Sequence, residues 1–308
     1  MTWLLFTIVS PVLSALVNYI DKYLIEKVAE GRGVGSLIIF SALMGLPVAL
    51  LILIFGTNVF IIQPRNALLI MLNGTFYVAW VLPYLYALQK DEASVVMPLF
   101  QISSVLAYAF GYVFLGETLY ARQFIGCLLI LVGAVGITLE RKVAKSGKRE
   151  VKVKTAVLAL VSLSCFFIAM SGVIFKSVAL EESFWVTSFW ENVGIFLSAL
   201  LLLRVPGYRS QFLAVLKVNK FKILTLNALN ESLISVGRIS LNYATLLVPI
   251  ALVFFVDTGF QPFFVMTFGT LLSLFFPKFT NEDIRFSKII QKLLAVSIMF
   301  AGTYFISF

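Results

Sequence analysis

Long apolar stretches recur along the whole chain and are separated by short polar segments. A helix that crosses the hydrocarbon core of a bilayer needs about 20 apolar residues. In lipid every backbone polar group must be satisfied internally, so we expect these stretches to be α-helical. The pattern predicts ten spans, at approximately 3–24, 36–55, 67–88, 93–115, 121–139, 155–179, 184–203, 222–247, 250–275 and 288–307.

A basic interval divides the ten spans into two sets of five. Asn73 in the third span corresponds to Asn230 in the eighth at an offset of 157, and the same offset relates Tyr86-Ala87 to Tyr243-Ala244. Matches in this order predict an internal duplication. We therefore expect a first five-helix repeat at 1–140, a basic loop at 141–154 and a second five-helix repeat at 155–308.

The Lys and Arg residues predict the orientation of the chain. When the loops are assigned alternately to the two membrane faces, nineteen basic residues fall on one face and only Arg65 and Arg122 on the other. Cytoplasmic loops carry the excess of basic residues, so we expect the 141–154 loop in the cytoplasm and both termini outside. In the first half the basic loops follow the first, third and fifth spans. In the second half they follow its second and fourth spans, which are spans seven and nine of the chain. An inverted repeat produces this change.

Composition agrees with a membrane protein and excludes a soluble one. The chain is 60% hydrophobic and 13% charged, whereas about a quarter of the residues of a soluble domain are charged. The formal net charge of +9 would suggest nucleic-acid binding in a soluble protein, but here the basic residues lie in short loops beside apolar segments. We therefore expect a bilayer and a small-molecule substrate as partners, and no nucleic acid. The fused halves are compatible with a monomer or a homodimer.

Several kinds of catalytic site are missing from the sequence. The chain has no histidine, and its two cysteines, Cys127 and Cys165, lie in separate apolar spans. This excludes a histidine-based triad, a zinc site made of His or paired Cys, and a disulfide framework. No GxxxxGK[ST] loop is present to bind ATP phosphates. We therefore expect a protein that is not an enzyme and that uses no metal or other cofactor.

One segment of the first half carries a recognisable set of motifs. The motifs are Ala93-Ser94-Val95-Val96-Met97-Pro98, Leu115-Gly116-Glu117, Gly126 and Gly133. Together with the inverted five-helix repeats, these motifs make the chain resemble the EamA-type proteins of the drug/metabolite transporter (DMT) superfamily. The motif match covers about fifty residues, Tyr86–Gly136, and no Gly-Glu follows at the matching place in the second half.

The resemblance implies that the first, third and fourth helices of each repeat line a central cavity. Spans one, three, four, six, eight and nine should then surround the cavity, with spans five and ten at the periphery. In one respect the resemblance and the charges disagree. Members of the superfamily commonly keep both termini in the cytoplasm, whereas the distribution of Lys and Arg places them outside.

Span eight carries an unusual stripe of polar residues. An ionised side chain at the bilayer centre costs about 2.5–3.5 kcal/mol on insertion scales, so it should face the bundle interior. Glu231 and Arg238 are two turns apart, about 10 Å along the axis, and need not pair. The stripe can line a cavity, or it can join helices by hydrogen bonds. Its members, at helical spacing, are Asn227, Glu231, Ser235, Arg238 and Asn242.

Three other spans carry polar or aromatic faces. Aromatic stripes in membrane helices also serve as packing or interfacial belts. Span three is the repeat partner of span eight, however, and aromatic rings with polar tips suit an organic solute or a cation. The substrate-binding candidates are Asn73, Tyr77, Trp80 and Tyr84 in span three, Gln101 in span four, Asn227, Glu231 and Arg238 in span eight, and Asp257 and Gln261 in span nine.

Further residues are expected to have structural roles. Glu191 and its neighbour Asn192 lie near the middle of span seven and need partners. Lys22 and Lys176 can each neutralise a carboxylate or snorkel to the membrane interface, and snorkelling is the favoured expectation for both. Glu117 is expected to cap or anchor a helix end. Gly126, Gly133 and Gly136 in span five should permit close helix packing. Prolines inside spans should kink their helices; these are Pro11, Pro47, Pro83, Pro98 and Pro262.

These features favour a secondary transporter that moves a small organic metabolite or drug-like solute across the plasma membrane by alternating access. Glu231, or failing it Asp257, is the candidate for proton coupling, because desolvation favours a protonated carboxyl and a nearby guanidinium favours the ionised one. Glu231 can instead belong to a static buried network. A flippase for a lipid-linked sugar or phospholipid is the alternative function. An enclosed midplane pocket would favour the carrier, and a lateral groove the flippase.

Overall fold

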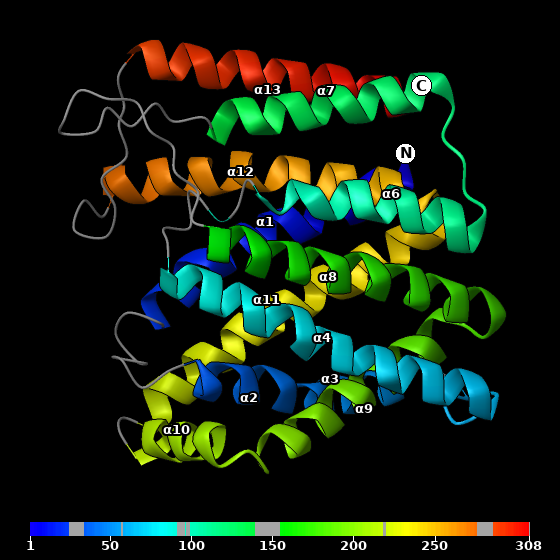
Figure 1. Ribbon diagram of the computed structural model, residues 1–308, viewed down its shortest axis with the longest axis vertical. Helices are drawn as coiled ribbons and strands as arrows, with labels where there is room; N and C mark the ends of the chain where they lie inside the picture. The colour runs from blue at the N-terminus through cyan, green and yellow to red at the C-terminus, as the bar shows by residue number, and fades with distance from the viewer. Residues whose placement is uncertain are drawn as a thin grey trace.

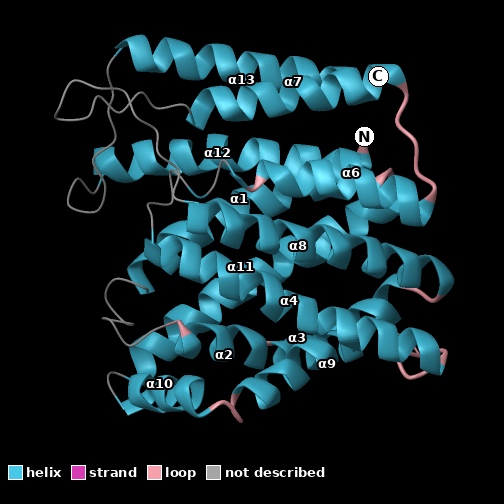
Figure 2. Ribbon diagram, in the orientation of Figure 1, coloured by secondary structure: helices cyan, strands magenta, loops and turns pink. Residues whose placement is uncertain are grey.

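The computed structural model describes residues 1–24, 34–56, 58–90, 96, 99–138, 155–217, 220–275 and 286–307. Within these ranges the chain forms helices joined by loops, with no strand (Figure 2). The 141–154 loop, Pro98 and most of the Ala93–Pro98 motif lie outside the described residues.

Helices occupy all of the predicted apolar ranges. The second range holds two helices, α2 and α3, and α10 lies between the seventh and eighth ranges. The helices are α1 (Thr2–Tyr23), α2 (Gly35–Leu43), α3 (Gly45–Phe55), α4 (Pro64–Lys90), α6 (Gln101–Leu115), α7 (Ala121–Thr138), α8 (Thr155–Glu181), α9 (Phe184–Leu202), α10 (Pro206–Lys217), α11 (Lys220–Leu247), α12 (Ile250–Phe275) and α13 (Phe286–Ser307).

Among the described residues, six candidate membrane spans are long and apolar enough to cross a bilayer. They coincide with α1, α2 plus α3, α4, α8, α9 and α12. Shorter apolar helices are Gln101–Leu115, Ala121–Val135 and Leu293–Ser307. α11 is long enough, but its polar stripe lowers its hydropathy. The chain is therefore an all-α, multi-pass membrane protein, and the count of ten crossings stays a prediction.

The outer surface of the helices is apolar. Large side chains such as Leu50, Ile54, Val113 and Leu294 are more than half exposed. Soluble monomers rarely expose extended apolar surface, whereas a bilayer solvates it. The exposed face and the buried polar face together explain why these helices assemble with their polar residues inward.

Glycines bring two helix pairs into close contact. In α7, Gly126 faces the backbone of Gly302 in α13, and Gly133 faces Met299 and Ala295. The packing role predicted for Gly126 and Gly133 is confirmed, while the surroundings of Gly136 are not described. A second close approach joins α4 to α9, where the space for a Cβ on Gly74 is occupied by backbone atoms of Glu191, Gly194 and Ile195.

Prolines occur inside several helices, as the sequence predicts. Pro11 lies within α1, Pro83 within α4 and Pro262 within α12. Pro47 is the third residue of α3. The first N–H groups of a helix have no partner within that helix, so the N–H that proline lacks is not needed there. The second apolar range is thus divided at Met44, between α2 and α3.

The helices are arranged in layers across the molecule. α7 and α13 lie side by side along one edge, and α10 lies at the opposite edge (Figure 1). Between them α1 packs against α11 and α12, while α8 packs against α4 and α6. The N- and C-termini lie toward the same end of the helices (Figure 1). This arrangement leaves the polar faces of α1, α4, α11 and α12 directed toward the middle.

Candidate substrate cavity

A cavity of about 210 Å³ lies among eight helices: α1, α2, α4, α6, α8, α9, α11 and α12. α7 and α13 contribute no lining residue. The polar and charged lining residues are Ser10, Ser14, Asn18 and Asp21 of α1, Ser41 of α2, Ser103 of α6, Ser171 of α8, Glu191 of α9, Asn227, Asn230, Glu231, Arg238 and Asn242 of α11, and Asp257, Thr258 and Gln261 of α12.

The polar face of α1 forms one wall of the cavity. Its lining residues recur every three or four positions, which places them on one side of the helix. Asp21 is buried and accepts a hydrogen bond from Asn230 Nδ2 at 2.8 Å. Tyr84 donates to Asn18 Oδ1 at 3.3 Å. None of these α1 residues is among the predicted binding residues, although their helical spacing can be seen in the sequence.

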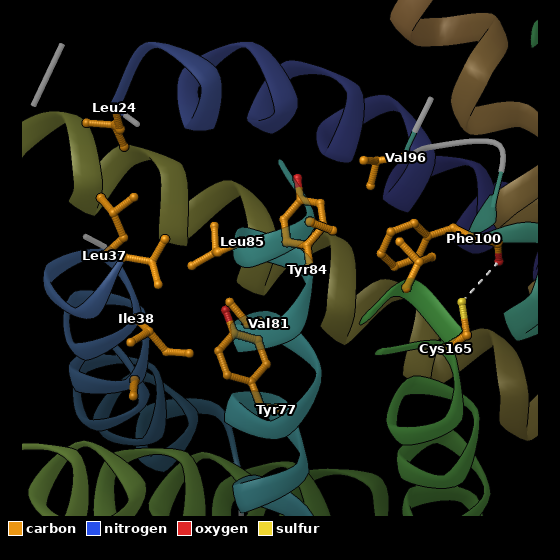
Figure 3. Packing of buried hydrophobic residues seen from close by; sticks show 14 of the residues in the cluster. Leu24, Leu37, Ile38, Tyr77, Val81, Tyr84, Leu85, Val96, Phe100 and Cys165 are labelled. Atoms are coloured by element: carbon orange, nitrogen blue, oxygen red, sulfur yellow. Dashed lines mark hydrogen bonds between the residues drawn. The ribbon is translucent and has the colours of Figure 1, made fainter. Parts of the chain in front are cut away.

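Aromatic rings of α4 form a second wall. Tyr77, Trp80 and Tyr84 follow one another along the helix, with ring centroids 5.6 and 6.1 Å apart. Tyr84 in turn contacts Phe100, with centroids 5.6 Å apart. Figure 3 shows Tyr77 and Tyr84 on α4, with Leu37 of α2 to one side and Phe100 to the other. The rings therefore present a continuous surface to a ligand.

Glu231 occupies the centre of the α11 stripe and is 3% exposed. Ser41 of α2 donates a short hydrogen bond to its Oε1, and Tyr77 donates to its Oε2 at 3.2 Å. Both partners are neutral hydroxyl groups. Within the described residues no basic side chain forms an ion pair with Glu231.

Arg238 forms an ion pair with a different carboxylate, Glu191 of α9. Its Nη1 lies 3.1 Å from Glu191 Oε2, and its Nη2 donates to Asn192 Oδ1 at 2.7 Å. Asn73 donates to the other oxygen of Glu191 at 3.0 Å. The guanidinium carbon also lies 5.4 Å from the centre of the Tyr77 ring. The prediction that Glu191 and Asn192 need partners is thus confirmed. Within the described residues, Arg238 and Glu231 form no ion pair with one another.

On α12, Asp257 and Gln261 line the cavity one turn apart. The hydroxyl of Ser10 lies beside the Asp257 carboxylate. The Oδ1 atom of Asp257 is buried and has no hydrogen-bond partner within the described structure. Such an unsatisfied acceptor is costly, and a ligand donor can satisfy it. Gln101 instead points to the backbone, where its Nε2 donates to Thr258 O at 2.6 Å.

The structure places the ten predicted binding residues in two groups. Asn73 and Gln101 are buried, form hydrogen bonds to neighbouring helices and do not line the cavity. Sequence reasoning did not include Asp21, Ser41 and Glu191, which do line it. The eight predicted residues that line it are Tyr77, Trp80, Tyr84, Asn227, Glu231, Arg238, Asp257 and Gln261.

The contributing helices agree with the arrangement expected from the resemblance and extend it. α1, α4, α6, α8, α11 and α12 correspond to spans one, three, four, six, eight and nine. α2 and α9 also contribute, through Leu37, Ser41 and Glu191. A single polar residue in an apolar helix, such as Ser41, has no periodic pattern that would have revealed it.

A buried ion pair links the two halves outside the cavity. Glu117 accepts a hydrogen bond from Ile250 N at 2.7 Å, at the start of α12, so its predicted role at a helix end is confirmed. It also forms an ion pair with Lys176, whose Nζ donates to Val248 O at 2.8 Å. The snorkelling predicted for Lys176 is therefore wrong, because this lysine is 6% exposed and finds both partners inside. The side chain of Lys22 lies outside the described residues.

Within the described residues, no three His, Cys, Asp or Glu side chains are grouped so that they could hold a metal ion. The cysteines are free and buried: Cys127 in α7 and Cys165 in α8. The chemistry available in the cavity is thus that of carboxylates, amides, hydroxyls, one guanidinium and aromatic rings. Groups of these kinds suit the binding of a solute, not its chemical conversion.

The first half of the chain matches a known family. The model of the EamA-like transporter family matches residues 1–139. The chain belongs to the EamA-like transporter family. Members are membrane transporters rather than enzymes, and the all-helical architecture with apolar spans agrees with that membership.

Two further comparisons found proteins that are similar to this chain. An uncharacterized protein of Methanocaldococcus jannaschii is 31% identical over 97 residues, which cover 32% of this chain and 71% of that protein. A solved structure, described only as the crystal structure of a protein, is similar over 98% of both chains, with a TM-score of 0.58 and 14% identity. At this identity the similarity establishes the fold alone.

Proposed function

We propose that this EamA-like protein is a secondary transporter that moves a small organic solute across the plasma membrane by alternating access, coupled to protons. The observation that carries this proposal is the cavity of about 210 Å³ among eight helices. It combines apolar, aromatic and charged walls, as small-molecule sites do. The position of the lining residues among eight helices supports a carrier, and a flippase for a lipid-linked sugar or phospholipid, which needs a lateral groove, is the alternative.

The helix contacts support two inverted five-helix repeats, at 1–140 and 155–308, joined by the 141–154 loop. In such a repeat α4 corresponds to α11 and α8 to α1. The contact of α4 with α8 is then matched by that of α11 with α1, and the contact of α6 with α8 by that of α12 with α1. The family match also ends at residue 139, where the first repeat ends.

The described basic residues support the proposed orientation. Arg65 lies at the start of α4 and Lys90 at its end, so the two lie at opposite ends of one long helix. The termini lie toward the same end of the molecule (Figure 1). We assign that end, with Arg65 and Arg122, to the outside and the end with Lys90 to the cytoplasm, in accordance with the positive-inside rule.

An asymmetry between contacts that the proposed repeat should make equal supports alternating access. α4 packs closely on α9, whereas its counterpart α11 touches α2 at only a few residues. Exchange of these two contacts would open the cavity toward the other face, because rocking of one repeat against the other moves equivalent pairs in opposite senses. The arrangement described is then one of two states.

Glu231 is the proposed proton carrier, with Asp257 as the second candidate. A buried carboxylate held by two neutral hydroxyls can gain a proton without breaking an ion pair. Arg238 is bound to Glu191 in this state, so it leaves Glu231 free to titrate. In the other state Arg238 can bind an anionic group or hold Glu231 ionised.

Glu231→Gln tests this proposal, because glutamine keeps the size and hydrogen-bonding capacity of glutamate but cannot titrate. A substrate is first found by thermal-shift screening of the purified protein, since a ligand of the folded state raises its apparent stability. In proteoliposomes we expect uptake driven by a pH gradient to vanish in Glu231→Gln while substrate exchange continues.

The matched control is Glu181→Gln, which removes a carboxylate from the exposed end of α8 and should leave both activities intact. Full gradient-driven uptake by Glu231→Gln would show that Glu231 is not the proton carrier. Movement of labelled lipid between leaflets, without solute uptake, would favour the flippase instead.

A further inference from the structure

The charges that line the cavity are mostly negative. Four carboxylates face it, those of Asp21, Glu191, Glu231 and Asp257, against the single guanidinium of Arg238. Arg238 is paired with Glu191 at 3.1 Å. Three carboxylates therefore remain for which the described chain supplies no basic partner.

The three carboxylates differ in how well the protein satisfies them. Glu231 accepts from two hydroxyl groups, and Asp21 accepts from Asn230. Asp257 alone has a buried oxygen, Oδ1, without a partner in the described residues. A buried acceptor without a donor is uncommon in native proteins. Asp257 is therefore the carboxylate at which a ligand donor would gain most.

The aromatic wall of α4 adds a second feature that suits a positive ligand. Trp80 lies between Tyr77 and Tyr84, and all three line the cavity. The faces of such rings attract ammonium groups, tryptophan most strongly, and the attraction increases when the groups are desolvated. The Arg238 guanidinium already lies over the Tyr77 ring, so Trp80 and Tyr84 are the rings that remain for a ligand cation. The apolar residues nearby, including Val81, Leu85 and Ile234, provide contact for an uncharged body.

We infer, resting on the proposed transport function, that the cavity binds a small organic cation: a protonated amine with an aromatic or apolar body. The ammonium group donates to Asp257, and the body lies against the aromatic wall of α4. A protonated amine beside these carboxylates favours their ionised form. Ionised carboxylates in a cavity of low dielectric favour a positive ligand and oppose an anion. The volume of about 210 Å³ restricts the ligand to a small molecule.

A zwitterionic ligand needs a second charged contact, and Arg238 is only partly available for it. Its two terminal nitrogens already donate to Glu191 and Asn192, and only its Nε has no partner among the described residues. A carboxylate that bound both a terminal nitrogen and Nε would displace Glu191. Displacing Glu191 would leave that carboxylate buried without a counter-charge, which costs several kcal/mol. The amine alone is therefore the better match.

The test measures binding of four related probes to the full chain in lipid nanodiscs at neutral pH. They share a phenyl ring and a short tail: 2-phenylethylamine is cationic, 2-phenylethanol neutral, 3-phenylpropanoate anionic and L-phenylalanine zwitterionic. We expect thermal stabilisation by the amine at about tenfold lower concentration than by the alcohol. We expect none from the propanoate, and weaker binding of phenylalanine than of the amine.

Variants of Asp257 test whether this residue recognises the ammonium group. Asp257→Asn should reduce the affinity for 2-phenylethylamine about tenfold and leave that for 2-phenylethanol nearly unchanged. Binding of the alcohol also reports that the variant is folded. Asp257→Glu should retain the preference for the amine. Glu181→Gln, which removes a carboxylate far from the lining residues, should bind all four probes as the unmodified protein does.

Three other outcomes of the binding measurements would overturn the inference or its assignment to Asp257. Equal or tighter binding of the alcohol, the propanoate or phenylalanine would show that the site does not select a cation, and so would an absence of binding by the amine. An unchanged preference in Asp257→Asn would remove Asp257 from the site. Selective amine binding without amine counterflow in liposomes would leave the cation site intact and contradict the transport function instead.

Discussion

At the contact between α4 and α9 two helix backbones touch, whereas at the contact between α2 and α11 the helices meet through polar side chains. Gly74 and Gly194 allow the first contact, since backbone atoms of the partner helix occupy the space for a Cβ on either glycine. The second contact contains the hydrogen bond from Ser41 to Glu231. In the proposed inverted repeat these two contacts correspond to one another, yet they are built from different residues.

The sequence offset shows where the difference arises. Asn73-Gly74 in the third span corresponds to Asn230-Glu231 in the eighth, so the position that allows backbone contact in one half carries a carboxylate in the other. Two helix backbones can meet at a glycine without leaving a buried polar side chain that needs a water molecule or another partner. A carboxylate at the matching position closes against α2 only when it is hydrogen-bonded or protonated. The comparison thus explains how one protonation could bias which contact closes.

The largest effect is expected from removing the cation beside the α4–α9 contact. Arg238→Gln leaves Glu191 buried without its ion-pair partner, and breaking one side of a buried pair typically costs about 3–5 kcal/mol. We expect a large decrease in the melting temperature of the purified protein. The double variant Arg238→Gln with Glu191→Gln should recover most of the loss.

Thermal unfolding followed by tryptophan fluorescence measures both variants. Equal melting temperatures for the single and double variants would show that the pair does not stabilise this contact.

A smaller effect is expected from adding one methyl group at the backbone contact. In Gly194→Ala the new Cβ would meet backbone atoms of Met71, which cannot give way as a side chain can. Overpacking of this kind costs about 1–3 kcal/mol. The matched control is Gly207→Ala in α10, where nothing lies within 4 Å of the added Cβ. A similar melting temperature for the two variants would show that α4 and α9 are not tightly packed.

The smallest effect is expected at the α2–α11 contact. Ser41→Ala removes one of the two hydroxyl donors to Glu231 and should cost about 1 kcal/mol, the net value of a typical hydrogen bond. The control Ser232→Ala removes an exposed hydroxyl that bonds only its own helix. Thermal unfolding should show a lower melting temperature for Ser41→Ala than for Ser232→Ala. A lower melting temperature for Ser232→Ala would argue against the Ser41–Glu231 hydrogen bond.

Periodicity carries most of the fold and much of the cavity. Apolar runs predict the helices, and the stripe on α11 predicts which side faces inward, because lipid cannot solvate Glu231 or Arg238. Eight of ten predicted binding residues line the cavity for this reason. Asn73 and Gln101 share the same inward faces, but their amides bond neighbouring helices. Periodicity gives the face of a residue and not its partner.

The residues that the sequence could not place depend on contacts between distant segments. Lys176 pairs with Glu117, 59 residues before it, and no local pattern predicts that meeting. Ser41 is the one lining residue of α2 that is polar, so no stripe marks it. Glu191 is recognisable from the sequence as a buried charge that needs a partner, but its place on the cavity wall depends on distant helices. Asp21 differs from both, because Ser14, Asn18 and Asp21 form a helical face that is visible in the sequence.

The most direct test of the account is whether one cavity position is reachable from both sides of the membrane in turn. Ser14 lines the cavity on α1 and is partly exposed. Ser14→Cys is made in a variant without Cys127 and Cys165, and a membrane-impermeant thiol reagent is applied to right-side-out and inside-out vesicles. Alternating access predicts modification from each side, with substrate or a pH gradient changing the two rates in opposite directions. Modification from one side only, under every condition, would contradict it.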